Sequence, residues 1–344
     1  MTDEKTLFWD EDNGSIVYID QTLLPGQFKM VTCMTIPRLA IAIQRLEIRG
    51  APALGVAGAF GVALAATKSR KKDFAAFLSE VEKNSRIIRE ARPTAINLAW
   101  GVDRVLSAIR KGKTPDEVRK IAVAEALKVA KEDGEICRTL GKNGAELIPD
   151  KATVLTHCNA GALACSEWGT ALGVIRSAKE AGKDVRVISC ETRPLLQGAR
   201  LTACELSRDG IPVTVITDST AAFLMRKGKI DCAIVGADRI TRDAVFNKIG
   251  TYTHAVTCKY HQIPFYVAAP LSTFDPKLSE SQVVIEERSR DEIATFGNRI
   301  TVPKKASVLN YAFDATPLDL VTAIVTEKGV HRHPLDLPAL LGNK

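Results

Sequence analysis

The first third of the chain and the remainder carry different patterns of apolar and polar positions. Two short apolar runs, 7–9 and 16–19, flank the turn-forming stretch 10–14, and this arrangement predicts a β-hairpin near the N-terminus. After Pro25 and Gly26 the apolar residues recur at helical spacing. That spacing predicts helices over residues 35–47, 51–67, 72–89, 97–111 and 114–140. The last of these opens on Thr114-Pro115-Asp116-Glu117, a capping-box start with proline at the first helical position.

From residue 151 onward, strand-like and helix-like stretches alternate. Short runs rich in β-branched residues predict strands at 153–156, 185–188, 213–216, 233–236 and 264–267. Helical stretches follow the first four of these strands, at 167–180, 195–208, 221–227 and 247–261. Such alternation is typical of a parallel sheet with helical crossovers. We therefore expect an α/β fold, in which a smaller, mainly helical N-terminal domain with a short β-hairpin, residues 1–130, precedes a Rossmann-like parallel-sheet domain, residues 131–344.

Composition narrows the class of protein. The 344 residues are 46% hydrophobic and 25% charged, which excludes a disordered or low-complexity chain. The net charge of +7 is small and the charges are interspersed, apart from a basic cluster at 68–72. We interpret that cluster as a solvated helix end rather than a nucleic-acid patch, and we expect no nucleic-acid partner.

The most apolar stretch, 51–67, is shorter than the roughly 20 residues of a membrane span. It is built from Ala, Gly and Val, and Gly55, Gly58 and Gly61 recur at every third position. This pattern favours a tightly packed buried helix. The polar start of the chain is not followed by an apolar core of signal-peptide type, so we expect no membrane association.

Eight cysteines are present, and none forms a CxxC pair or has zinc-ligand spacing with a histidine. On that spacing we expect no metal. Several of the cysteines sit inside apolar runs, which indicates free buried thiols and a reducing, cytoplasmic compartment. The chain has neither GxGxxG after a strand nor GxxxxGK[ST], so no motif supports a nucleotide cofactor, and we expect none.

In open parallel sheets, ligands bind beyond the carboxyl ends of the strands. Cys158 follows one predicted strand and Asp238 follows another. A lone cysteine is more often a packing thiol, and a lone aspartate is often a turn residue. Together over one sheet, a thiol and a carboxyl group could divide acid and base roles.

A second candidate segment is Gly50-Ala51-Pro52, which opens a predicted helix. Such an entry presents free N–H groups to an anion, and Arg49 and Arg92 are cations that could hold a phosphate bidentately. Helix packing explains the glycine equally well on sequence alone.

These segments together resemble a known family. The resemblance rests on Arg49–Ala53, Arg92–Asn97, Thr156–Ala164, Glu191–Arg200, Gly236–Ile240, Asn247–Tyr252 and Ala312–Asp314, and it extends from about Arg49 to Gly329. The chain closely resembles the methylthioribose-1-phosphate isomerases. They belong to the superfamily of the regulatory α, β and δ subunits of translation initiation factor 2B, which also includes ribose-1,5-bisphosphate isomerases.

The resemblance implies an aldose–ketose isomerase of methionine salvage that converts 5-methylthioribose 1-phosphate to 5-methylthioribulose 1-phosphate and forms a homodimer. It implies that Asp238 is the general acid and Cys158 its partner across the reacting carbons. By position, the other substrate contacts are Arg49, Gly50 and Ala51, which match the phosphate-binding segment, together with Arg92, Gln197, Asn247 and Lys248. The chain departs from many members at 241–246, where its loop is one residue shorter.

Two alternatives stay open. The chain resembles the non-catalytic initiation-factor subunits, although a scaffold needs neither Cys158 nor Asp238. It also resembles ribose-1,5-bisphosphate isomerases, whose second phosphate would demand another cluster of cations. Activity on 5-deoxyribose 1-phosphate is a further expectation, because an apolar pocket discriminates poorly over a missing thioether.

Overall fold

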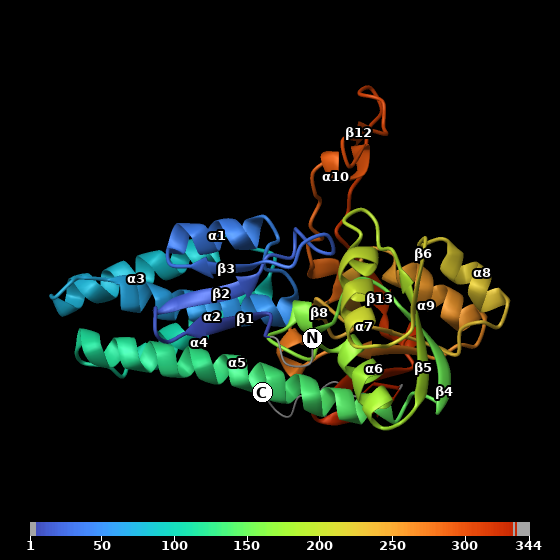
Figure 1. The fold of residues 1–344 in the computed structure, drawn as a ribbon, viewed down its shortest axis with the longest axis horizontal. Helices are drawn as coiled ribbons and strands as arrows, with labels where there is room; N and C mark the ends of the chain where they lie inside the picture. Colours follow the sequence, from blue (N-terminus) through green and yellow to red (C-terminus); the bar gives the residue numbers. More distant parts are fainter. Residues whose placement is uncertain (1–4, 333, 336–344) are drawn as a thin grey trace. The chain divides into compact units, whose positions relative to one another are not determined.

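Figure 1 shows the fold in a computed structural model, which describes residues 5–332 and 334–335. The chain forms two compact units: Met1–Thr139 with Ala160–Gly173, and Leu140–Asn159 with Val174–Lys344. The boundary between residues 139 and 140 falls within the long helix Pro115–Ala145. The short segment Ala160–Gly173 belongs to the first unit, although the residues on either side of it belong to the second. The domain boundary between residues 130 and 131 stays a prediction.

The N-terminal β-hairpin is confirmed. Strands β1 (Leu7–Asp10) and β2 (Ser15–Ile19) pair antiparallel, and a third strand, β3 (Met30–Cys33), pairs with β2. Sequence patterning missed β3 because Cys33 is its only buried side chain, so the run lacks the alternation that marks a half-buried strand.

The five helices of the first third are confirmed with shifted ends. They are α1 (Ile36–Gln44), α2 (Ala51–Lys68), α3 (Phe74–Arg89), α4 (Ile96–Ile109) and α5 (Pro115–Ala145). The predicted start of α5 is confirmed, since Thr114 Oγ1 accepts from Glu117 N at 3.2 Å. The Glu117 carboxylate accepts from Lys113 N at 2.8 Å, one residue before the usual partner in a capping box.

Helix α2 forms the centre of the first unit. By length and composition it is apolar enough to cross a membrane, but 78% of its apolar window is buried inside the unit. Glycines on both helices bring α2 close to α4. A Cβ on Gly58 of α2 would lie 2.5 Å from the Leu98 carbonyl oxygen, and one on Gly101 of α4 would lie 1.9 Å from the Gly55 carbonyl oxygen. The expected tightly packed helix is therefore confirmed.

Replacing Gly101 by alanine should destabilise the protein. Alanine gains about 1 kcal/mol in helix propensity. The new methyl group meets backbone, which no side-chain rotation relieves, so the overpacking cost should reach the upper end of the usual range, about 3 kcal/mol. Urea unfolding should show a net loss of about 2 kcal/mol. The matched control is Gly26→Ala, whose methyl group would meet its nearest atom at 3.7 Å; equal stability of the two variants would contradict the prediction.

The second unit contains a seven-stranded sheet of order β15-β14-β10-β7-β4-β5-β6. Its strands are β4 (Lys151–Thr156), β5 (Asp184–Cys190), β6 (Val213–Ile216), β7 (Cys232–Val235), β10 (Phe265–Ala268), β14 (Ala323–Thr326) and β15 (Gly329–Arg332). All neighbours pair parallel except β14 and β15. The predicted α/β fold is confirmed, with β14 and β15 as additions that the sequence pattern did not indicate.

Three helices of this unit are shorter than expected, and a fourth keeps its expected length. The shorter helices are α6 (Ala171–Glu180), α7 (Ala203–Arg208) after a π-helical turn at Gly198–Thr202, and α9 (Thr251–Tyr260), and the fourth is α8 (Thr220–Arg226). The expectation of a helix from residue 247 is wrong. Residues Ala244–Lys248 form strand β9, between β8 (Arg239–Ile240) and β13 (Phe313–Pro317). Gly250, in the left-handed region at φ 104°, separates this strand from α9.

The remaining elements are short. They are the turns of 3-10 helix at Ala162–Ala164, Leu271–Thr273, Glu280–Gln282 and Leu318–Leu320, the helix α10 (Asp291–Ala294), and the hairpin of β11 (Thr295–Phe296) and β12 (Arg299–Ile300).

Candidate active site

Candidate residues follow three neighbouring parallel strands of the large sheet. Strand β4 pairs with β7 on one side and with β5 on the other. Cys158 comes two residues after β4, Thr192 two residues after β5, and Asp238 three residues after β7. Because the carboxyl ends of parallel strands lie at one edge, these residues share the edge at which ligands of such sheets bind.

Cys158 has an unusual backbone conformation. Its φ is 65°, in the left-handed region, and Thr192 has a φ of 67°. Non-glycine residues are uncommon there, and such strain occurs often at functional sites. Two threonine hydroxyls hold the flanking peptides: Cys158 N donates to Thr192 Oγ1 at 2.8 Å, and Thr202 Oγ1 donates to the Cys158 carbonyl oxygen at 2.7 Å. The thiol therefore lies on a backbone fixed from both sides.

The Thr202 hydroxyl also belongs to a buried polar network. It accepts from Asn159 Nδ2 at 3.2 Å, and the same amide donates to Glu205 Oε1 at 2.8 Å. Arg176 completes the network with a buried ion pair to Glu205 at 2.8 Å. Networks of this kind restrict side chains to one arrangement when each member has a partner.

Replacing Thr202 by valine should destabilise the protein by about 1–3 kcal/mol, because the Cys158 carbonyl group and the Asn159 amide lose a partner in a buried environment. Thr202→Ser keeps the hydroxyl and should retain most of the stability. Urea unfolding of both variants tests this expectation. A serine variant as unstable as the valine variant would indicate that the methyl group, not the hydrogen bonds, matters.

Asp238 lies at the start of the β8–β9 hairpin. Its backbone N donates to the Phe246 carbonyl oxygen at 2.8 Å, and its side chain is partly exposed. Within the segment 241–246, residues 241–243 form the turn of this hairpin and 244–246 belong to β9. Thr241 N donates to the Ala244 carbonyl oxygen at 2.9 Å and closes the turn. The departure from the family pattern is thus a tight turn a few residues from Asp238.

The other predicted contacts of the second unit are buried. Among the described residues, Gln197 Oε1 has no hydrogen-bond partner. Asn247, on β9, donates to Thr251 Oγ1 at 3.0 Å. Lys248 Nζ donates to the Ala312 carbonyl oxygen at 2.7 Å and lies 4.7 Å from the centre of the Phe313 ring. A buried amide oxygen without a partner needs an explanation, and a bound ligand supplies one.

Four predicted contacts belong to the first unit. Gly50 is the N-cap of α2 at φ 96°, and Ala51 is the first residue of that helix. A Cβ on Gly50 would lie 2.4 Å from Ala164 Cα, so close approach of backbone requires glycine there. Arg49 precedes this cap, and Arg92 lies between α3 and α4. Gly50 therefore serves both purposes that the sequence suggested: it begins helix α2, and it allows close packing of the backbone.

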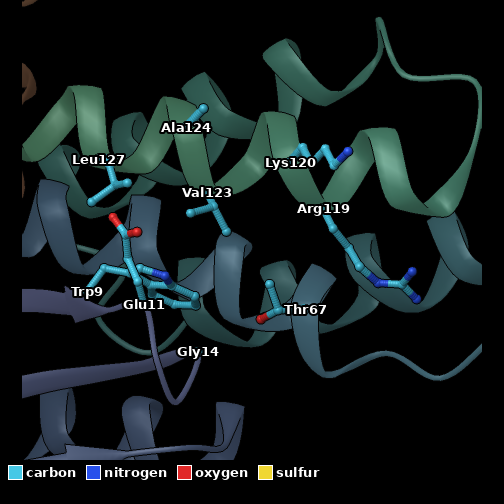
Figure 2. Close-up of a pocket in the computed structure, with 9 residues that line it drawn as sticks. All are labelled: Trp9, Glu11, Gly14, Thr67, Arg119, Lys120, Val123, Ala124 and Leu127. Carbon is cyan, nitrogen blue, oxygen red and sulfur yellow. The ribbon is translucent and has the colours of Figure 1, made fainter.

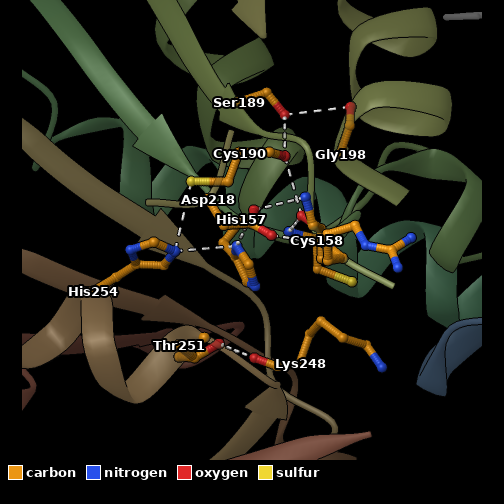
Figure 3. Close-up of polar contacts among 12 residues, drawn as sticks. His157, Cys158, Ser189, Cys190, Gly198, Asp218, Lys248, Thr251 and His254 are labelled. Atoms are coloured by element: carbon orange, nitrogen blue, oxygen red, sulfur yellow. Dashed lines mark hydrogen bonds and ion pairs between the residues drawn. The ribbon is translucent and has the colours of Figure 1, made fainter. Parts of the chain in front are cut away.

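Sequence analysis missed a cluster of histidines and a cysteine. Cys190 Sγ lies 3.5 Å from His254 Nε2, which lies 3.2 Å from His157 Nδ1 (Figure 3). Burial lowers the pKa of His157 to about 4 and that of His254 to about 3, so both rings are neutral at physiological pH. Burial raises the pKa of the Cys190 thiol.

These three side chains come from the end of β4, from β5 and from α9, so no local spacing could have revealed them. The first unit has a comparable cluster of Asp133, Cys137 and Cys165. The expectation of a metal-free chain rested on spacing alone, and it does not exclude ligands that the fold brings together.

Asp314 has a structural role that the sequence pattern did not indicate. Its carboxylate accepts from Gly250 N at 2.7 Å and from Tyr252 N at 3.1 Å, so it caps the N-terminus of α9. Burial raises the pKa of this carboxyl group to about 6, although the two backbone donors oppose the effect. Asp314 thus fixes the segment that follows Asn247 and Lys248.

A separate pocket lies within the first unit (Figure 2). It has a volume of about 440 Å³, and its lining residues are Trp9, Glu11, Gly14, Thr67, Arg119, Lys120, Val123, Ala124 and Leu127. None of the predicted site residues is among them, so this pocket carries no part of the candidate site.

Comparison with known proteins agrees with the family resemblance. Residues 47–333 match the model of the initiation factor 2 subunit family. The chain is 52% identical over 337 residues to a putative methylthioribose-1-phosphate isomerase of Methanosarcina acetivorans, which covers 98% of this chain and 97% of that protein.

Two solved structures match the fold over nearly all of the chain. A 5-methylthioribose 1-phosphate isomerase of Pyrococcus horikoshii OT3 is 41% identical with a TM-score of 0.91, covering 98% of this chain and 94% of that one. A protein of A. fulgidus described as translation initiation factor eIF-2B, subunit delta, is 51% identical with a TM-score of 0.89, covering 98% and 99%.

Proposed function

The chain belongs to the initiation factor 2 subunit family, and from this membership we propose that it is an isomerase that converts 5-methylthioribose 1-phosphate to 5-methylthioribulose 1-phosphate. The structural observation that supports the proposal is the placement of Cys158 and Asp238 beyond the carboxyl ends of the adjacent parallel strands β4 and β7. The reaction needs two groups that exchange protons with one substrate, and this edge offers a thiol and a carboxyl group.

The chemistry sets the roles. In the substrate the anomeric oxygen carries phosphate, so the ring opens by cleavage of the bond between C1 and the ring oxygen. The ring oxygen gains a proton, one hydrogen moves from C2 to C1, and the C2 hydroxyl loses its proton to become the ketone. Asp238 is the proton donor in this scheme, and Cys158 is its partner across the reacting carbons.

The remaining residues bind the substrate. Gln197 has a buried amide oxygen without a partner among the described residues, which a substrate hydroxyl would satisfy. Asn247 and Lys248 lie on β9 in the same unit. Arg49, Gly50, Ala51 and Arg92 are the phosphate and substrate contacts that the family resemblance implies. These assignments, like the catalytic pair, are proposals for mutagenesis.

The decisive experiment is turnover by the purified chain. We expect conversion of 5-methylthioribose 1-phosphate to the ketose, weaker conversion of 5-deoxyribose 1-phosphate, and little conversion of ribose 1,5-bisphosphate. Preference for the bisphosphate would favour the alternative isomerase.

The regulatory alternative has one observation in its favour, the 51% identity to the A. fulgidus protein described as an initiation-factor subunit. Absence of turnover by folded protein, together with binding to initiation factor 2, would favour a scaffold. The same preparation should give the oligomeric state. We expect a symmetric homodimer by sedimentation, and a monomer at micromolar concentration would contradict this.

A further inference from the structure

We propose that His157, Cys190 and His254, with Asp218 as the fourth ligand, form a structural zinc site in the second unit. All three primary donors are buried, and their ligand atoms lie within 4.8 Å of one another. The donor set of two imidazoles, one thiolate and one carboxylate is among those that bind zinc in proteins.

Two of the distances between the donor atoms are close to those expected around a single ion. Zinc–nitrogen bonds of about 2.0–2.1 Å and zinc–sulfur bonds of about 2.3 Å place tetrahedral ligand atoms roughly 3.3–3.6 Å apart. The separation of His254 Nε2 from His157 Nδ1 is 3.2 Å, and its separation from Cys190 Sγ is 3.5 Å. The ligand atoms of His157, Cys190 and His254 all lie within 4.8 Å of one another, so they can converge on one ion.

The His157 ring is held in place by a backbone group outside the cluster. Its Nε2 lies 2.8 Å from the Ile249 carbonyl oxygen, which can only accept, so this nitrogen carries the proton. The unprotonated Nδ1 therefore directs its lone pair at the cluster. A ring nitrogen bonded to a backbone carbonyl is the usual support for a histidine that binds a metal through its other nitrogen.

The carboxylate of Asp218 lies beside His157. Its Oδ1 lies 3.9 Å from His157 Nδ1, and its two oxygens accept from the backbone N of Thr192 and of Arg193 at 2.7 Å each. Each carboxylate oxygen keeps a lone pair for a further partner.

Charge and proton balance are simple. The ion enters as Zn²⁺, and the Cys190 thiol releases one proton to solvent. His157 binds as the neutral ring through Nδ1, and His254 binds as the neutral ring through Nε2 after its proton moves to Nδ1. The thiolate and the Asp218 carboxylate then offset the two positive charges. Every ligand is supplied by the protein, so the ion has a structural role that joins β4, β5 and α9, and it takes no part in the isomerisation.

The test uses cobalt(II) as a spectroscopic probe on the full chain. We expect the metal-free protein to bind one cobalt ion, with a sulfur-to-cobalt charge-transfer band in the near ultraviolet, and zinc to displace it. Binding of zinc should also raise the thermal unfolding midpoint. Absence of the band in folded wild-type protein, titrated with excess cobalt, would overturn the proposal without relying on any variant.

Paired variants identify the site. Cys190→Ala should abolish the charge-transfer band, whereas Cys137→Ala, which removes a buried thiol from the cluster of the first unit, should leave it intact. His254→Ala should weaken zinc binding at least about 10-fold in competition with a chromogenic chelator. Circular dichroism checks that each variant is folded. A band that persists in Cys190→Ala and disappears in Cys137→Ala would place the ion in the other cluster and overturn the proposal.

Discussion

Asparagine in place of Asp238 should lower turnover of the phosphorylated methylthio sugar at least about 100-fold, the lower end of what a positioned acid or base supplies. The amide keeps the shape of the side chain and its capacity for hydrogen bonds, but it has no proton to donate near neutral pH. The backbone N of residue 238 still donates to the Phe246 carbonyl oxygen, so the β8–β9 hairpin should keep its conformation. The loss should therefore appear in kcat, while substrate binding persists.

The matched control for this prediction is Asp319→Asn, which changes an exposed carboxyl group of the same unit outside the predicted site. Steady-state kinetics and calorimetric titration with substrate separate turnover from binding in both variants. Wild-type turnover by Asp238→Asn would mean that the acid is misplaced. Loss of substrate binding with normal folding would instead assign Asp238 to recognition.

The sequence predicted the sheet most strongly at its central strands, because these are buried on both faces. Residues 232–235 are buried throughout, and such continuous apolar runs between helical stretches are a strong signal for parallel strands. The positions of Cys158 and Asp238 followed from the same rule, since parallel strands bring their carboxyl ends to one edge. The sequence alone could not show that Thr192 and Thr202 hold the backbone of Cys158, because these contacts span 34 and 44 residues.

Errors arose where a local pattern supports two structures. The sequence pattern predicted a helix over residues 247–261, but residues 247 and 248 belong to strand β9, which pairs with β8 on one side and with β13 on the other. Long-range pairing of this kind overrides local propensity. The cluster of His157, Cys190 and His254 could not be predicted from the sequence either, since its members come together only in the folded chain.

Serine in place of Cys158 should also lower turnover at least about 100-fold, if the thiol exchanges a proton during the reaction. Serine keeps a small polar group on the same backbone, and the Thr192 and Thr202 contacts involve only backbone atoms of residue 158. A hydroxyl group releases its proton far less readily than a thiol, so the geometry persists while the chemistry fails. Measured kcat should fall, and thermal stability should stay close to that of the wild type.

Chemical modification of the thiols tests the same role of Cys158. All eight cysteines lie in the described part of the chain, where Cys158 and Cys204 are partly exposed and the other six are buried. Iodoacetamide should therefore modify Cys158 and Cys204 first, and inactivation should follow modification of Cys158, with protection by substrate. Cys204→Ser is the matched control and should retain near-normal turnover and full sensitivity to the reagent. If Cys158→Ser turned over substrate at the wild-type rate, or if inactivation followed Cys204 instead, the thiol at the end of β4 would have no part in the reaction.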